Sequence, residues 1–231
     1  MHLLTGISSC LLCGARAPAN LALCPPCQAE LPSIQSACER CALTLGPQPP
    51  GERLCGQCSV DTPPFERCYP LGDYSFPLRE MIARFKFHGR FSIGRALGQL
   101  LAQRLAPAFS VSPPDVLVPV PLHKSRLRLR GFNQSMEIAQ QLSRHLGIPI
   151  ALGYCQRVHA SKPQRGLRAD ARRKNVQGVF RIAPEAINQP PRHIVIVDDV
   201  VTTMATAKAI AYLLKKEGVE RVDVACLARV S

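Results

Sequence analysis

The chain contains no tryptophan, and its other large aromatic residues are only 8 Phe and 4 Tyr. Proteins that bind single-stranded nucleic acid without sequence preference stack bases on such rings, so the composition offers few platforms for that mode of binding.

Long apolar runs are also missing from the sequence, since no run approaches the roughly 20 apolar residues that span a bilayer. The segment Met1–Ser9 also lacks the basic start and the apolar stretch of a signal peptide. We therefore expect a soluble, cytoplasmic protein with no membrane insertion, in a compartment where thiols stay reduced.

Acidic residues are scarce, since 16 Asp and Glu face 29 Lys and Arg, for a net charge of +13. The excess is uneven. Residues 1–70 contain no lysine and have 4 Arg against 5 acids, whereas residues 124–174 contain 12 basic residues against only Glu137 and Asp170. A basic field of this density attracts polyanions, such as a diphosphorylated sugar or a nucleic-acid backbone. A solvated surface that keeps the protein soluble is the other interpretation of the same charges.

Eight of the 11 cysteines form four CxxC pairs, which are Cys10/Cys13, Cys24/Cys27, Cys38/Cys41 and Cys55/Cys58. In a reducing compartment such pairs indicate metal, and two CxxC turns complete a closed tetrahedral zinc shell. The spacing predicts two structural zinc ions. Sequential and cross-braced pairing both stay open, and disulfides or a redox CxxC are the alternatives. The other three cysteines are expected to be small apolar fillers; they are Cys68, Cys155 and Cys226.

With 231 residues the chain can form one sizeable core and a small appended module. The cysteines place the module at residues 1–64, which have few periodic apolar stretches and must be stabilised by metal. Residues 65–231 carry the alternating strand and helix patterns of a doubly wound, mostly parallel α/β sheet. The predicted elements are strands at 68–74, 115–120 and 194–197, helices at 77–87, 93–105 and 136–146, and a basic loop at 124–134.

The apolar, β-branched run Ile194–Val197 stops at two carboxylates, Asp198 and Asp199. In an open parallel sheet ligands bind at the carboxyl ends of strands, and two carboxylates there can accept hydrogen bonds from vicinal ribose hydroxyls. Hydroxyl side chains follow where a helix is expected to begin and where free amides favour a phosphate; they are Thr202, Thr203 and Thr206. The pattern predicts a sugar-phosphate site. The alternative is a core strand whose acidic pair only caps the next helix.

Residues 198–206 resemble the loop of type I phosphoribosyltransferases that binds 5-phosphoribosyl 1-diphosphate (PRPP). The resemblance implies that the acidic pair holds the ribose 2- and 3-hydroxyls. It also implies that the turn Thr202–Thr206, including Met204 and Ala205, wraps the 5-phosphate. The family has glycine at the position of Met204, and glycine permits a close backbone approach or a positive φ. Methionine here predicts a looser phosphate turn.

Further motifs extend the resemblance over nearly the whole chain. They are Pro-Val-Pro-Leu-His at 119–123, Arg-Gly-Phe-Asn-Gln at 130–134, Gln164, Asn-Val-Gln-Gly-Val-Phe at 175–180 and the four CxxC pairs. Together they are similar to the ComF family of competence-associated proteins, in which a zinc-ribbon-like cysteine module precedes a type I phosphoribosyltransferase-like domain. The resemblance implies a link to natural transformation and the use of incoming DNA. The partners it implies are PRPP, single-stranded DNA and competence or recombination proteins.

By position, the segment 120–130 corresponds to the pyrophosphate loop of these enzymes. Pyrophosphate leaving from C1 develops charge that cations can stabilise, with Mg2+ bound to its oxygens. The candidate catalytic residues are Lys124, Arg126 and Arg130. Such a transfer depends on positioning and electrostatics and needs no protein nucleophile, so the lack of a Ser-His-Asp set is no objection.

Residues 157–174 lie where type I enzymes have a mobile loop. The alternatives for this segment are a lid, a nucleic-acid arm and an exposed loop.

Three histidines are candidate acid–base groups, although no orienting carboxylate is evident in sequence; they are His88, His123 and His159.

The leading hypothesis is a zinc-stabilised, PRPP-binding phosphoribosyltransferase with an unidentified acceptor. A non-catalytic PRPP sensor is the first alternative, and Met204 favours it. A single-stranded-DNA-handling factor that contacts the backbone through the basic segments is the second. An enzyme requires an acceptor pocket beside the acidic pair, whereas a DNA-binding protein requires a continuous cationic groove.

Overall fold

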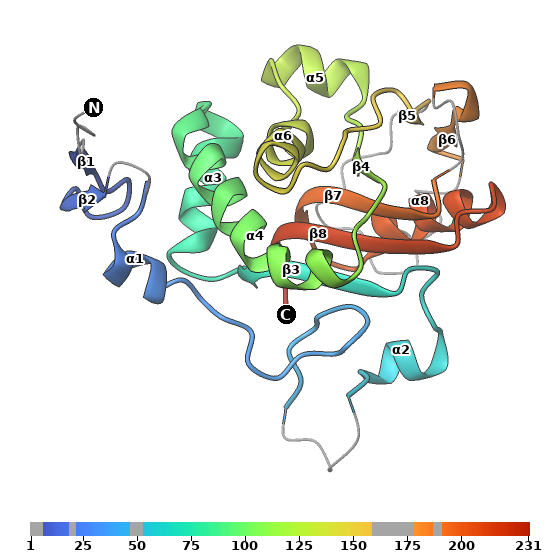
Figure 1. The fold of residues 1–231 in the computed structure, drawn as a ribbon, viewed down its shortest axis with the longest axis horizontal. Coiled ribbons are helices and arrows are strands. Elements are labelled where there is room, and N and C mark those ends of the chain that lie inside the picture. Colours follow the sequence, from blue (N-terminus) through green and yellow to red (C-terminus); the bar gives the residue numbers. More distant parts are fainter. Residues whose placement is uncertain (1–6, 19–21, 47–52, 159–177, 187–190) are drawn as a thin grey trace.

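A computed structural model of the chain describes residues 7–18, 22–46, 53–158, 178–186 and 191–231 (Figure 1). Its centre is a parallel four-stranded sheet with the strand order β3–β8–β7–β4. The strands are β3 (Arg67–Asp73), β4 (Val116–Pro119), β7 (His193–Val201) and β8 (Arg221–Arg229). This arrangement confirms the predicted α/β fold with a parallel sheet.

Helices cover both faces of the sheet. On one face lie α3 (Leu78–His88), α4 (Phe91–Val111) and α6 (Gln134–Leu146), and on the other lies α8 (Ala205–Lys216). Side chains alternate along β7, so that Val195 and Val197 pack with α3, α4 and α6 while Ile194 and Ile196 pack with α8. A strand buried on both faces has no polar alternation. This explains the unbroken apolar run that marks β7 in the sequence.

Two segments differ from the prediction. The basic segment 124–134, predicted as a loop, contains the helix α5 (Lys124–Arg130), and His123 caps it by accepting a hydrogen bond from the Ser125 amide at 3.3 Å. This helix buries no residue, so its sequence carries no apolar stripe that would reveal it. The strand β7 also runs beyond the predicted end at Val197. The acidic pair therefore lies within the last part of the strand rather than after it.

The smaller elements complete the chain. They are β1 (Ile7–Ser9), β2 (Arg16–Pro18), α1 (Pro25–Ala29), α2 (Gly56–Val60), β5 (Cys155–Arg157), β6 (Phe180–Ile182) and the 3-10 turn η1 (Pro184–Ala186). β1 pairs with β2, and β5 with β6, in antiparallel ribbons. Among the described residues, no helix is both long enough and apolar enough to span a bilayer.

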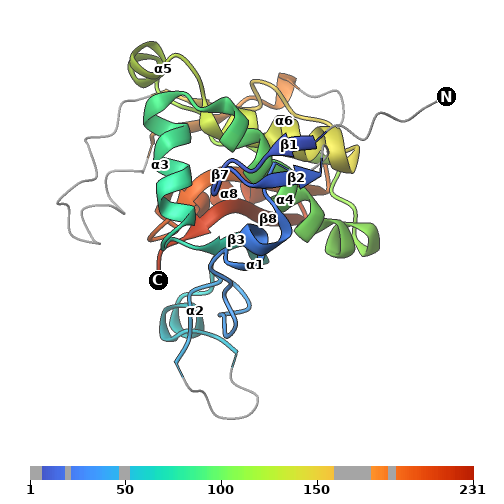
Figure 2. The same cartoon turned by 90° about the vertical axis from the view of Figure 1, so that its left-hand side faces the viewer.

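The N-terminal segment runs along one side of the sheet, from β1 and α1 to α2 (Figure 2), and it meets the exposed edge of β3. The Cys68 amide donates to the Arg40 carbonyl at 2.8 Å, and the Asp73 amide donates to the Pro32 carbonyl at 2.9 Å. At Gly72 a Cβ atom would lie 2.2 Å from the Pro32 oxygen, so only glycine fits this close approach. The segment thus satisfies donors that an edge strand would otherwise leave open.

Candidate functional site

The acidic pair near the end of β7 is held by three different elements. The Asp198 carboxylate accepts hydrogen bonds from the Ser135 hydroxyl on α6 at 3.1 Å and from the Asp199 amide at 2.8 Å. The Asp199 carboxylate accepts from the Val200 amide at 2.7 Å and forms an ion pair with Lys86 Nζ on α3, also at 2.7 Å. Lys86 and Ser135 thus belong to the candidate site, and no sequence pattern connects them with the acidic pair.

The two carboxylates are not electrostatically equivalent. Loss of solvent around its carboxyl, followed by the charge of Asp199, raises the pKa of Asp198 to about 7. Asp199 is itself buried, and it has the Lys86 ammonium as its partner. Near neutral pH Asp198 therefore exchanges between a protonated and an ionised form. It can donate to or accept from a hydroxyl-bearing ligand, while Asp199 acts as a paired carboxylate.

The turn after β7 leads directly into α8, a 12-residue helix that begins at Ala205. Met204 precedes this helix with φ 60° and ψ 6°, the left-handed conformation that glycine adopts without cost. Its side chain is buried in the cluster around α8, whereas Thr202 is exposed and Thr203, Ala205 and Thr206 are half-buried. The hydroxyls and the free amides at this helix start form an arrangement suited to an anion.

Arg229, at the end of β8, connects this turn to the cysteine-rich segment. Its buried guanidinium donates to the Cys41 carbonyl at 2.9 Å through Nε. Nη1 donates to the Thr202 carbonyl at 2.5 Å and to the Val230 carbonyl. The sequence analysis did not single out Arg229, because no motif surrounds it. Its partners Cys41 and Thr202 lie 188 and 27 positions away along the chain.

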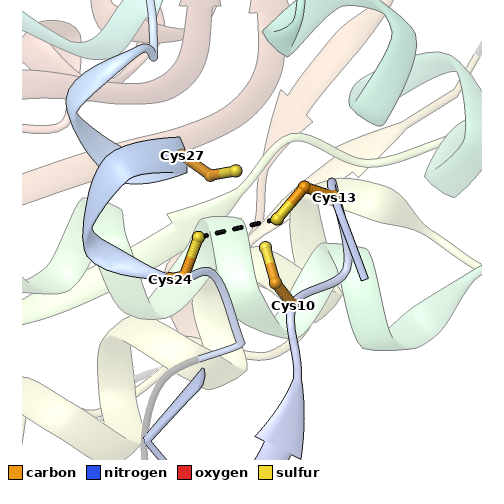
Figure 3. Close-up of side chains that lie close together, drawn as sticks. All are labelled: Cys10, Cys13, Cys24 and Cys27. Carbon is orange, nitrogen blue, oxygen red and sulfur yellow. Dashed lines mark hydrogen bonds between the residues drawn. The ribbon is translucent and has the colours of Figure 1, made fainter. Parts of the chain in front are cut away.

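The eight CxxC cysteines form two tetrads, Cys10/Cys13/Cys24/Cys27 and Cys38/Cys41/Cys55/Cys58, in each of which the Sγ atoms lie within 4.8 Å of one another. Figure 3 shows the first tetrad, whose thiols converge from the β1–β2 hairpin and from α1. The Sγ–Sγ separations are 3.7 Å for Cys13 and Cys24 and 3.6 Å for Cys41 and Cys55. A tetrahedral site with Zn–S distances of about 2.3 Å requires separations of about 3.8 Å.

The cysteines therefore group sequentially rather than in a cross-braced arrangement. Sulfur-only donors at tetrahedral spacing fit structural zinc, and the two tetrads suggest two such ions. The remaining cysteines Cys68, Cys155 and Cys226 are buried within one apolar cluster, as expected of fillers.

Comparison with known proteins assigns both parts of the chain. Residues 7–59 match the double zinc ribbon domain, and residues 133–231 match the phosphoribosyl transferase domain. Competence protein F of Haemophilus influenzae is 37% identical over 210 residues, covering 90% of each chain. The chain belongs to the ComF family. DNA utilization protein YhgH of Escherichia coli is 36% identical over 98% of this chain and 99% of its own length. Competence protein ComFC of Bacillus subtilis is 28% identical over 85% of this chain and 79% of its own length.

In this ComF-family chain the three predicted catalytic cations lie on α5 but do not line one cavity. Lys124 lines a cavity of about 600 Å³ beside β5. Arg126 and Arg130 line a second cavity of about 590 Å³, together with Lys86. Arg130 also donates to the Gln134 side chain at 2.7 Å. The second cavity is thus connected to the acidic pair through Lys86, which touches both.

The histidines occupy different environments. His123 caps α5, and its Nδ1 lies 2.7 Å from the Ser125 hydroxyl, so it has a structural role. His88 is exposed at the end of α3 and lines a cavity of about 920 Å³ with Leu11 and Arg84. His159 and the loop residues 159–174 lie outside the described residues.

Proposed function

We propose that this ComF-family protein binds PRPP together with Mg2+ and transfers the phosphoribosyl group to an acceptor, in a process connected with competence or DNA utilisation. In this proposal residues 1–64 form the zinc-binding module and residues 65–231 the phosphoribosyltransferase-like domain. The observation that carries it is the acidic pair Asp198 and Asp199 at the end of a parallel strand, followed by a hydroxyl-rich turn at the start of α8.

The residues present suit each part of PRPP. The carboxylates of Asp198 and Asp199 accept from the ribose hydroxyls, and they offer the oxygen donors that Mg2+ prefers. The turn Thr202–Thr206 and the α8 amides hold the 5-phosphate. Mg2+ held by Asp198 and Asp199 would supply positive charge that offsets the charge of the pyrophosphate.

The cations of α5 stabilise the leaving pyrophosphate in this proposal; they are Lys124, Arg126 and Arg130. The C1–O bond to pyrophosphate breaks as the acceptor bonds to C1, so the protein contributes position and electrostatic stabilisation and no nucleophile.

Binding of PRPP is expected to strengthen with pH between about pH 6 and pH 8. The pKa of Asp198 is about 7, so rising pH converts it to the carboxylate that accepts from a ribose hydroxyl. If only the ionised form binds, the affinity rises by about tenfold over this range. Calorimetric titration of PRPP with Mg2+ at pH 6, 7 and 8 measures this change in affinity.

The matched control is Asp198→Asn, which keeps the shape of the side chain but does not titrate in this range. Any residual slope in this variant comes from the phosphates of PRPP and is subtracted. A wild-type profile as flat as that of the variant would remove Asp198 from the ribose site.

The alternative of a PRPP sensor without turnover is supported by Met204, whose positive φ strains the phosphate turn. Met204→Gly is expected to tighten PRPP binding, because glycine has no side chain and lets the backbone of the turn approach the 5-phosphate closely. Relief of the left-handed conformation, worth about 1 kcal/mol, acts on the free energy of unfolding instead, because Met204 already has this conformation in the free protein. The same variant loses a buried side chain, a change that costs roughly 2–5 kcal/mol in comparable core truncations, so its free energy of unfolding should fall.

Calorimetry and thermal unfolding separate the two effects of Met204→Gly. Ala42→Gly is the matched control, since Ala42 is the other non-glycine residue of positive φ in the described part of the chain. It should leave PRPP affinity unchanged. Weaker PRPP binding in Met204→Gly would show that the methionine side chain does not hold the backbone away from the 5-phosphate.

A role in handling single-stranded DNA is the second candidate. It is supported by the net charge of +13 and by relatives named as competence and DNA utilization proteins. In this alternative the basic segments contact the phosphate backbone, with a strong dependence on salt, and competence or recombination proteins are the partners.

A further inference from the structure

Several of the chain's few aromatic residues line the cavity between α3, α4 and α5. Of the 8 phenylalanines, Phe87, Phe91 and Phe132 line this cavity, and Phe85 packs behind them. The side chains of Phe87 and Phe91 are 62% and 39% exposed. Burial of these rings would stabilise the fold, so their exposure indicates a binding surface. The composition predicts few platforms on which a base can stack, but the structure gathers several of the rings at one place, where they can form such a platform.

Two of the rings, Phe91 and Phe132, are anchored through the buried ring of Phe85, and the third, Phe87, is contacted by a guanidinium. Phe132 lies 5.5 Å from the fully buried Phe85 and 4.7 Å from Phe91, measured between ring centroids. The Arg130 guanidinium lies over the Phe87 ring at 5.6 Å from its centroid. Anchored rings with exposed faces form a platform for a flat aromatic group. Arg130 can also stack on such a group, since a guanidinium is itself planar.

The charge of the cavity points to an anionic ligand. Its charged lining residues in the described part of the chain are Lys86, Arg126 and Arg130, with no carboxylate among them. Lys86 is paired with Asp199, whereas Arg126 is exposed and has no ion-pair partner among the described residues. A guanidinium exposed beside a stacking platform suits a phosphate group.

We infer that this cavity binds a nucleobase that carries a phosphate, with the base stacked on Phe87 and Phe91 and the phosphate held by Arg126 and Arg130. This ligand can be a free nucleotide or one residue of a single strand. The inference goes beyond the proposed function, because binding here requires no PRPP. Arg126 and Arg130 serve the leaving pyrophosphate in the proposed function, so the nucleotide and PRPP should compete for these two residues. Through the Lys86–Asp199 ion pair of 2.7 Å, the site nevertheless lies beside the acidic pair.

The test uses 2-aminopurine, whose fluorescence is quenched when the base stacks on an aromatic ring. The probes are 2-aminopurine deoxynucleoside 5'-monophosphate and a single-stranded octamer with one 2-aminopurine among abasic residues, so that no neighbouring base quenches the free probe. Two unlabelled strands are compared as competitors, an octamer that contains bases and an octamer of abasic residues. Titration into the zinc-loaded full chain, without PRPP, should quench the probes. Quenching of the monophosphate assigns the site to free nucleotides, and quenching of the octamer alone assigns it to a strand.

Phe87→Ala is expected to weaken binding by roughly 5- to 150-fold, the range of one base–aromatic stacking contact, and Phe87→Trp should retain it. Phe87 is largely exposed, so its truncation removes little buried area. Tyr212→Ala is the matched control. Tyr212 is 54% exposed and carries a cation, Lys216 Nζ at 4.8 Å from the ring centroid, but it lies on α8 and outside this cavity.

Three results would overturn the inference. One is the absence of quenching in the wild-type chain, and another is an equal loss of binding in Phe87→Ala and Tyr212→Ala. The third is competition by the abasic octamer as strong as that by the base-containing octamer, which would mean backbone contact without base stacking. If Phe87→Ala instead abolished capture of a protein partner while nucleotide binding was absent, the platform would be a protein-docking surface.

Discussion

Replacing Asp198 and Asp199 together with alanine is expected to abolish measurable PRPP binding while the protein stays folded. Hydrogen bonds to charged groups contribute about 1.5–3 kcal/mol each, so the loss of two carboxylates weakens binding by roughly 100-fold or more. The fold should tolerate the change because the two carboxylates disfavour each other and Asp198 is held with a raised pKa. Lys86, released from Asp199, is 23% exposed and can turn to solvent.

Calorimetric titration of PRPP with Mg2+ measures the effect, and thermal unfolding confirms that the variant is folded. Asp61→Ala is a suitable control, since Asp61 is exposed and also pairs with a lysine, Lys208 at 2.8 Å. It should leave PRPP affinity unchanged. Unchanged PRPP affinity in a folded double variant would exclude the ribose assignment of the acidic pair.

Loss of the second metal site should weaken PRPP binding, whereas loss of the first should not. The chain purified without chelator is expected to contain close to two zinc ions, and Cys55→Ser or Cys24→Ser should each remove one of them. The second tetrad is linked to the phosphate turn because Arg229 donates to the carbonyls of both Cys41 and Thr202. The structure shows no equivalent link from the first tetrad, within its described residues.

Metal analysis and PRPP titration of the two serine variants separate these effects. Arg229→Gln tests the link without removing a thiolate, and it should weaken PRPP binding while the content of two zinc ions is retained. Equal PRPP affinity in Cys55→Ser, Cys24→Ser and wild type would show that the zinc module and the phosphate turn are independent. Metal-free protein whose cysteines do not react with Ellman's reagent would indicate disulfides.

The features that the sequence predicts well are those whose chemistry lies in a short stretch of chain. The eight cysteines of the two metal sites follow from CxxC spacing, although their sequential grouping does not, and the parallel strand β7 follows from its β-branched run. Asp198 and Asp199 are visible as candidates because they are adjacent to each other and to the turn. In each of these cases the local pattern and the tertiary environment agree.

The features that it predicts poorly depend on contacts between distant elements. Lys86 and Ser135 reach the acidic pair from α3 and α6, and Arg229 joins two segments from the end of β8. The aromatic cavity likewise draws its residues from three helices and the turn after α5. No spacing rule places such residues together. Helix α5 was missed for a different reason, since a basic helix that buries no residue has no apolar periodicity.

The most direct test of the central claim is titration of PRPP into the wild-type, zinc-loaded chain at pH 8, with and without Mg2+, beside ribose 5-phosphate and pyrophosphate as separate ligands. We expect saturable binding of one PRPP per chain, strengthened by Mg2+. We also expect weaker binding of each fragment, because the acidic pair and the phosphate turn hold one end of PRPP and the basic residues of α5 hold the other. No saturable binding of PRPP, or PRPP binding no tighter than that of pyrophosphate alone, would contradict the central claim.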